Sequence, residues 1–181
     1  METMKTIVTR RSVRSYKTEQ IPEEALNEIL AAGSIAAMGM KAYDRLHMAV
    51  IQSEEALGKL NEGIGRLMAK VMPGRGNGNF LMGAPTVVIV SALDPDKCPM
   101  KGMHYINSGC VAENIMLAAA DKGIGSVVLG IAGDVVKNDS GLKKELGIPE
   151  EFTPLFAIAL GYRADEAPEK TLEQRITVSR V

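Results

Sequence analysis

The sequence contains few of the residues from which metal centres, disulfide frameworks and nucleophilic triads are built. Among 181 residues there are two cysteines and two histidines. Cys98 and Cys110 form neither a CxxC pair nor a disulfide framework, and His47 and His104 lie far apart in the chain. We therefore predict no metal site, no cysteine–histidine or serine–histidine–aspartate machinery, and a reducing, cytoplasmic compartment.

The chain also lacks an excess of charge and any long apolar run. Its formal net charge is −1 and aromatic residues make up 4% of the sequence. This balance argues against a nucleic-acid-binding protein, which needs a basic surface. No apolar stretch is long enough to span a bilayer, and residues 1–5 lead into an amphipathic pattern instead of a signal peptide. We expect no membrane partner and one domain over residues 1–181.

Hydrophobic periodicity predicts helices and strands that alternate around a central sheet. The spacing of apolar residues and the capping signals predict helices over 4–10, 23–33, 54–71, 104–122 and 140–146. Runs rich in β-branched residues predict strands over 46–51, 86–90, 126–131 and 155–160, with a further strand possible at 176–179. These elements indicate an α+β or α/β sandwich. The helix over 104–122 is apolar on more than one side, which indicates a buried helix.

The segment Arg10–Tyr16 holds three arginines and two serines within seven residues. In an extended segment Arg10, Ser12 and Arg14 project to the same side. Guanidinium groups and a hydroxyl that converge in this way bind phosphate or carboxylate, because arginine engages such groups with two hydrogen bonds. The alternative is a solvated basic turn at the end of a helix, where cations also favour the helix dipole.

Two glycine-rich stretches do not match nucleotide-binding loops. The glycines from Gly123 to Gly130 follow a helix and precede a strand, the reverse of the dinucleotide-binding order. The loop from Gly74 to Gly78 lacks the Gly-Lys-Ser/Thr ending of a P-loop. We interpret each as a turn or as a place where a flat ligand approaches the backbone. An anion site without acid–base residues indicates chemistry on a bound cofactor, or no chemistry.

The chain resembles the FMN-dependent nitroreductase family along nearly its whole length. The segment Arg10–Tyr16 is similar to the family's opening Arg-Arg-Ser-x-Arg-x-Phe/Tyr motif. Further similar segments follow in the family's order: Ile21–Glu24, Gly83–Pro85, Asn114–Ala119 leading into Gly123–Ser126, Leu146–Glu150 and Leu160–Tyr162. Each segment is weakly specific alone, and the ordered set is strongly specific.

The resemblance implies a fold and an activity. The fold is α+β, a three-layer α/β/α sandwich whose central, mainly antiparallel sheet is flanked by helices in an intertwined homodimer. The helix 104–122 would form the dimer core, and residues 176–181 would pair with the partner's sheet edge. The implied activity is a ping-pong reduction of nitroaromatic, quinone or similar electron-poor acceptors by NAD(P)H through FMN. The alternative is a non-catalytic flavin carrier or sensor.

The resemblance also implies a set of cofactor-binding residues and no catalytic side chain, because the chemistry takes place on the flavin N5. The FMN contacts implied in this way are Arg10, Arg11, Ser12, Arg14, Met38, Lys41, Asn77, Leu129, Gly130, Ile131, Lys170 and Arg175. Two positions depart from the family pattern. Lys41 stands where relatives have an asparagine, and we hypothesise that its charge favours anionic reduced flavin. Leu172 stands where relatives have a phosphate-binding arginine, with Arg175 as the nearest substitute. Loops 73–80 and 94–102, with the Lys41 loop, are expected to shape the acceptor pocket.

Overall fold

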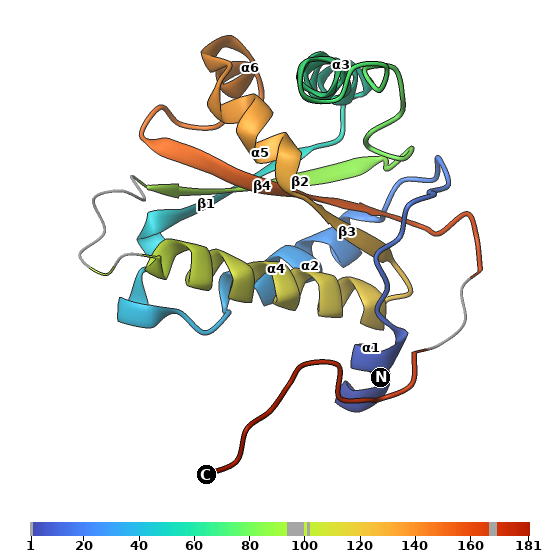
Figure 1. Cartoon of the computed structure of the whole chain (residues 1–181), viewed down its shortest axis with the longest axis vertical. Helices are drawn as coiled ribbons and strands as arrows, with labels where there is room; N and C mark the ends of the chain where they lie inside the picture. The colour runs from blue at the N-terminus through green and yellow to red at the C-terminus, as the bar shows by residue number, and fades with distance from the viewer. Residues whose placement is uncertain (1, 94–99, 101, 167–169) are drawn as a thin grey trace.

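The computed structural model describes residues 2–93, 100, 102–166 and 170–181. A four-stranded sheet lies between two layers of helices (Figure 1). Its strands are β1 (Leu46–Ile51), β2 (Thr86–Leu93), β3 (Gly125–Leu129) and β4 (Phe152–Gly161), in the order β1-β2-β4-β3 with every neighbouring pair antiparallel. The prediction of an α+β fold with a central antiparallel sheet is confirmed.

Helices cover both faces of the sheet. On one face lie α3 (Glu54–Val71), α5 (Gly130–Lys137) and α6 (Ser140–Glu145); on the other lie α2 (Glu23–Ser34) and α4 (Met103–Asp121), with α1 (Thr3–Thr9) beyond them (Figure 1). Short 3₁₀ turns at Gly39–Lys41 and Tyr43–Arg45 connect α2 to β1. Over the described residues, no helix has the length and apolar character needed to cross a bilayer.

The strand β2 separates two hydrophobic cores. Val87 and Ile89 face the core beneath α3 and α5, whereas Val88 and Val90 face the core beneath α2 and α4. All four side chains are fully buried. A strand buried on both faces is a continuous apolar run in sequence, not an alternating one, and this explains why the sequence predicts a strand over 86–90, although β2 continues to Leu93.

The helix α4 packs closely against α2, as its small residues suggest. A Cβ atom added to Gly33 of α2 would lie 2.7 Å from Cγ1 of Ile115, so glycine is what allows this approach. The Asn114 side chain also donates a hydrogen bond to the Ala32 carbonyl oxygen at 3.0 Å. One side of α4 stays uncovered, because Tyr105 and Ile106 are 59% and 61% exposed.

The predicted strand over 126–131 is wrong at its end. Strand β3 stops at Leu129, its last residue paired with β4, and helix α5 begins at Gly130. Gly133 allows α5 to lie close against the sheet, because a Cβ atom there would collide with the Leu155 carbonyl oxygen of β4. Helix α5 therefore crosses the sheet at a glycine contact that a periodicity analysis does not detect.

The predicted terminal strand at 176–179 is also wrong for the single chain. Residues 170–181 form neither helix nor strand, and Ile176 is 81% exposed. A strand needs a hydrogen-bonded neighbour. The backbone bond that joins this tail to the rest of the chain, from the Lys170 N–H to the Val8 carbonyl oxygen, lies before the segment.

Candidate functional site

The arginine segment begins where α1 ends and then runs along the edge of the sheet. Arg10 is the residue after α1, and its N–H donates to the Thr6 carbonyl oxygen at 2.9 Å. The Val13 N–H donates to the Ser126 carbonyl oxygen of β3 at 3.0 Å. Because Val13 points into the core, the neighbouring Ser12 and Arg14 are exposed. The segment is extended, as the sequence predicts.

Two arginine contacts set the outer surface of this segment. The Arg14 guanidinium donates to the Ser12 carbonyl oxygen at 3.3 Å. The Arg10 Nε lies 3.6 Å from the Glu113 carboxylate of α4, an ion pair at the surface. A surface ion pair such as Arg10–Glu113 contributes about 0–1 kcal/mol to stability, so Arg10 loses little when it binds another anion instead.

Cations from the C-terminal tail join the arginine segment. Burial lowers the pKa of the Lys170 ammonium, and the positive charges of Arg10, Arg11 and Arg175 lower it further. The Arg175 Nε donates to the Glu173 carboxylate at 2.6 Å. We call Arg10, Arg11, Lys170 and Arg175 the cationic cluster. A merely solvated basic turn would not attract a second basic segment, so the cluster fits an anion-binding site better.

A small cavity of about 70 Å³ lies beside the cationic cluster. It is lined by Thr9, Arg10, Arg11, Val13, Ala120, Gly123, Ile124, Gly125, Ser126 and Arg163. The hydroxyls of Thr9 and Ser126 and the Nε of Arg163 are buried without a hydrogen-bond partner. The sequence analysis did not propose these three as binding residues. Arg163 directly follows the Leu160–Tyr162 segment, which is a signal that could have identified it.

The loop that carries Met38 and Lys41 is fixed to the start of α4. The Gly39 N–H donates to the Asn107 Oδ1 at 2.9 Å, and the Asn107 Nδ2 donates to the Gly39 carbonyl oxygen at 3.3 Å. Met40 and Lys41 have φ angles of 63° and 51°, which side-chain-bearing residues rarely adopt. Met38 is half-buried and Lys41 is exposed. Asn107, which holds this strained turn, was missed by the sequence analysis.

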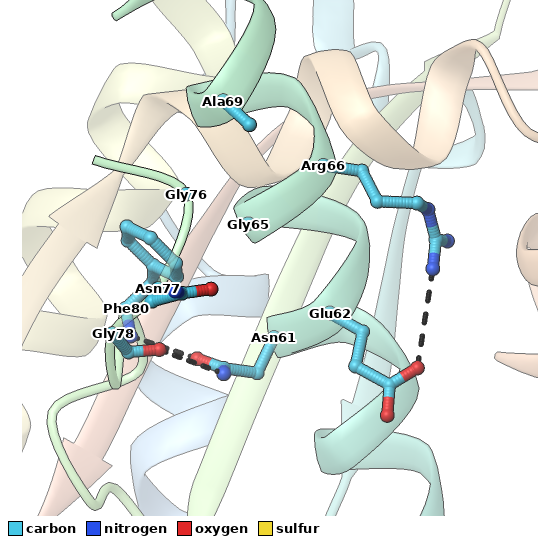
Figure 2. Close-up of a pocket in the computed structure, with 9 residues that line it drawn as sticks. All are labelled: Asn61, Glu62, Gly65, Arg66, Ala69, Gly76, Asn77, Gly78 and Phe80. Atoms are coloured by element: carbon cyan, nitrogen blue, oxygen red, sulfur yellow. Dashed lines mark hydrogen bonds and ion pairs between the residues drawn. The ribbon is translucent and has the colours of Figure 1, made fainter. Parts of the chain in front are cut away.

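Asn77 lies in the loop that folds back on α3 (Figure 2). The Asn61 side chain of α3 secures this loop, because it donates to the Gly78 carbonyl oxygen at 3.1 Å and accepts from the Phe80 N–H at 2.7 Å. Between the loop and α3 is an open groove of about 510 Å³, lined by Asn61, Glu62, Gly65, Arg66, Ala69, Gly76, Asn77, Gly78 and Phe80. The exposed Asn77 amide thus lies at the mouth of a groove.

The predicted ring-contact residues lie at the junction of β3 and α5. Leu129 ends the strand, and Gly130 and Ile131 form the first turn of the helix. No side chain caps this helix start. Its first N–H groups are therefore open to a ligand that lies against the turn.

The structure brings some of the predicted site residues together and leaves others apart. The arginine segment meets Lys170 and Arg175. Asn77 belongs to the loop after α3, on the opposite face of the sheet from α1, and the Lys41 loop contacts the first turns of α4, far from α1 (Figure 1). A single chain does not assemble all of them in one pocket.

The other polar groups singled out in the sequence show no catalytic arrangement. Burial lowers the pKa of His47, with the Glu151 charge acting in the opposite direction, and its ring packs 5.3 Å from that of Phe152. Cys110 is a half-buried free thiol in α4. Over the described residues, no three His, Cys, Asp or Glu side chains form a metal-binding group. Cys98 and most of the 94–102 loop lie outside the described residues.

Comparison with known proteins bears on the whole chain. The model of the "Nitroreductase family" matches residues 7–162. A nitroreductase with bound FMN from Bacteroides fragilis superposes with a TM-score of 0.83 at 33% identity, covering 99% of this chain and 100% of that one. A protein from Archaeoglobus fulgidus, named for NADH dehydrogenase or NAD(P)H nitroreductase activity, is 32% identical over 182 residues, covering 99% of this chain and 96% of that protein. The match spans the arginine segment and all four strands, and the chain therefore belongs to the nitroreductase family.

Proposed function

We propose that this protein is an FMN-dependent oxidoreductase that uses NAD(P)H to reduce electron-poor acceptors such as nitroaromatics and quinones. The observation that carries the proposal is the cationic cluster, which joins the arginine segment to the C-terminal tail. Membership of the nitroreductase family supports it. So do the FMN-bound relative from Bacteroides fragilis and an NADPH-flavin oxidoreductase from Vibrio harveyi that is 27% identical.

The residues of the cluster fit the phosphate of FMN. Burial lowers the pKa of Lys170, and the positive charges of Arg10, Arg11 and Arg175 lower it further, against the raising effect of Glu113, so cations are concentrated around this ammonium. A phosphate dianion would relieve this repulsion and accept charge-assisted hydrogen bonds from Arg10, Ser12, Arg14 and Lys170. When bound, FMN supplies the two-electron chemistry at its N5, for which the chain offers no side chain of its own.

Other residues would position the flavin ring. Leu129, which ends β3, and the uncapped N–H groups of Gly130 and Ile131 at the start of α5 would contact the ring edge. The Asn77 amide would donate to a polar edge of the ring. Lys41, held in a strained turn by Asn107, would place a cation near the flavin and stabilise negative charge there.

We further propose that the active unit is a homodimer and that each flavin contacts residues of both chains. One chain keeps the cationic cluster apart from the Lys41 loop and from Asn77 (Figure 1). The exposed Tyr105 and Ile106 of α4 offer an apolar surface for a second copy. NAD(P)H and the acceptor are the expected small-molecule partners, and the cysteine pattern keeps the cytoplasm as the expected compartment.

Steady-state kinetics test the proposed function. NADH or NADPH oxidation is measured at several fixed concentrations of a quinone or a nitroaromatic compound. We expect turnover that requires added FMN and the acceptor, with parallel double-reciprocal lines, because the oxidised product NAD(P)+ leaves before the acceptor enters the same site. Flavin binding without turnover for any acceptor would instead support the alternative, a flavin carrier or sensor.

A further inference from the structure

The polar side chains around the 70 Å³ cavity are all hydrogen-bond donors. Three of the residues that line it are arginines, and the other two polar residues, Thr9 and Ser126, carry hydroxyl groups. No acidic side chain lines it among the described residues. A cavity with donors and no carboxylate is complementary to an anion. Its volume is enough for a few water molecules, so it admits the oxygens of one phosphate but not a flavin ring.

Ser126 and Arg163 are the two cavity residues whose polar groups most clearly need a partner. Ser126 is 1% exposed and its Oγ has no hydrogen bond. The Arg163 Nε is buried and equally unpartnered. A buried donor without an acceptor is unfavourable, so a ligand that accepts hydrogen bonds from these groups binds more tightly.

The backbone fixes Arg163 beside the arginine segment. Arg163 forms an antiparallel bridge with Tyr16, and the Ala164 N–H donates to the Ser15 carbonyl oxygen at 3.0 Å. The side chain then passes over Gly125, whose added Cβ atom would lie 2.9 Å from the Arg163 Cγ. Glycine at position 125 therefore leaves room for this arginine to reach the cavity.

Arg163 also differs from the outer cations in being free of acidic partners. Arg175 is bound to Glu173, and Arg10 lies near Glu113. For Arg163, no ion pair and no side-chain hydrogen bond occurs within the described part of the chain. Its full positive charge is therefore available to a ligand.

We propose that Arg163 and Ser126 bind the phosphate of FMN from the inner side of the cationic cluster. This inference rests on the proposed function. In the proposed arrangement, Arg10 and Lys170 bind the phosphate from its solvent side. The Arg163 guanidinium and the Ser126 hydroxyl donate hydrogen bonds to the phosphate oxygens that enter the cavity. Leu172, which stands where relatives are expected to have a phosphate-binding arginine, is apolar and 70% exposed. Arg163 thus supplies a cation in place of the one that is absent at position 172.

Comparison of FMN with riboflavin, which lacks the phosphate, tests this inference directly. Apoprotein is titrated with each flavin and the dissociation constants are measured by fluorescence quenching. We expect Arg163→Met to weaken FMN binding about tenfold or more and to leave riboflavin binding unchanged, because only the phosphate contact is lost. Ser126→Ala should act in the same direction with a smaller effect, and Arg163→Lys should retain part of the FMN affinity.

Lys144→Met is the control, because it removes one positive charge from an exposed side chain of α6 that is not proposed to bind the flavin. It should change neither dissociation constant. Equal losses for FMN and riboflavin in Arg163→Met would show a structural role and overturn the inference, as would two unchanged constants. If the wild-type protein binds neither flavin, the proposed function fails and this inference with it. The ³¹P resonance of bound FMN, which we expect to shift in Arg163→Met, gives a second measurement.

Discussion

Arg10 occupies the point where α1, the arginine segment and α4 meet. Its guanidinium is near Glu113 and close enough to Lys170 to lower that residue's pKa. We expect Arg10→Met to weaken FMN binding by about tenfold or more, since a charge-assisted hydrogen bond to phosphate is lost. Lys5→Met, which removes an exposed cation from α1, is the control and should bind FMN normally. The FMN dissociation constants are measured by titration with flavin fluorescence as the signal. Equal constants for Arg10→Met and wild type would contradict the proposed phosphate site.

We expect Lys170 to make FMN binding depend on pH. Its pKa lies below the ordinary lysine value because of burial and nearby cations, and a bound phosphate would raise it again. A ligand that raises a pKa binds better to the protonated form. FMN affinity should therefore be highest near neutral pH, where the phosphate is largely a dianion, and fall as the pH rises further through the lowered Lys170 pKa. Isothermal titration over this range measures the effect, and Lys170→Met should abolish it. A wild-type affinity that rises with pH above neutral would be the opposite of this expectation.

At the residue scale, the sequence predicts what is local and misses what depends on packing. The arginine segment is recognisable because its residues are neighbours in the chain. Arg163 and Asn107 are not, because their partners come from distant elements: Arg163 meets the segment only after β4 is in the sheet, and Asn107 meets Gly39 only after α4 packs beside the loop. Charge patterns give no information about such long-range contacts.

Among the elements, α5 depends most on a single residue. Helix α5 crosses β4 at Gly133, where any Cβ atom would collide with the Leu155 carbonyl oxygen. We expect Gly133→Ala to lower the free energy of unfolding by about 1–3 kcal/mol, because backbone atoms of the sheet would have to move. Urea unfolding followed by circular dichroism measures this loss.

Gly58→Ala in α3 is the control for that substitution. Gly58 is exposed and nothing lies within 4 Å of the position of its added Cβ atom. The same change should there raise stability by about 0.5–1 kcal/mol, since alanine favours the helix. If both variants were stabilised, the close contact between α5 and β4 would be refuted.

The elements that the sequence predicts well are those whose pattern matches their burial. Helix α3 begins where Ser53 caps it, with the Ser53 Oγ accepting from the Ala56 N–H at 3.1 Å. Strand β2 holds an unbroken apolar run over Val87–Val90, because helices cover both of its faces. The residues after Leu129 mislead, because Gly130 and Ile131 continue the strand's apolar run in the sequence, whereas in the structure they begin helix α5. The tail at 176–179 also misleads. Its alternating apolar and polar residues fit a strand, but among the described residues of the single chain no neighbouring strand pairs with it.

At the scale of the whole molecule, the uncovered apolar residues predict association. Large exposed apolar side chains occur on α1, on α4 and along the tail, at Met4, Ile7, Tyr105, Ile106, Leu172, Ile176 and Val178. We expect a dimer mass in light scattering, because burial of this surface stabilises a second copy. Ile106→Glu should shift the mass toward the monomer and weaken FMN binding together, whereas Val50→Glu, on the exposed edge strand, should not. A wild-type monomer at micromolar concentration would contradict the shared site.

The central claim is that the chain's two basic segments together hold the phosphate of FMN. A crystal structure of the protein grown with excess FMN tests it most directly. We expect the phosphorus atom between the Arg10 guanidinium and the Lys170 ammonium, with a phosphate oxygen directed toward Ser126 and Arg163. A phosphate bound elsewhere, or arginine side chains turned to solvent with no flavin between them, would contradict the account.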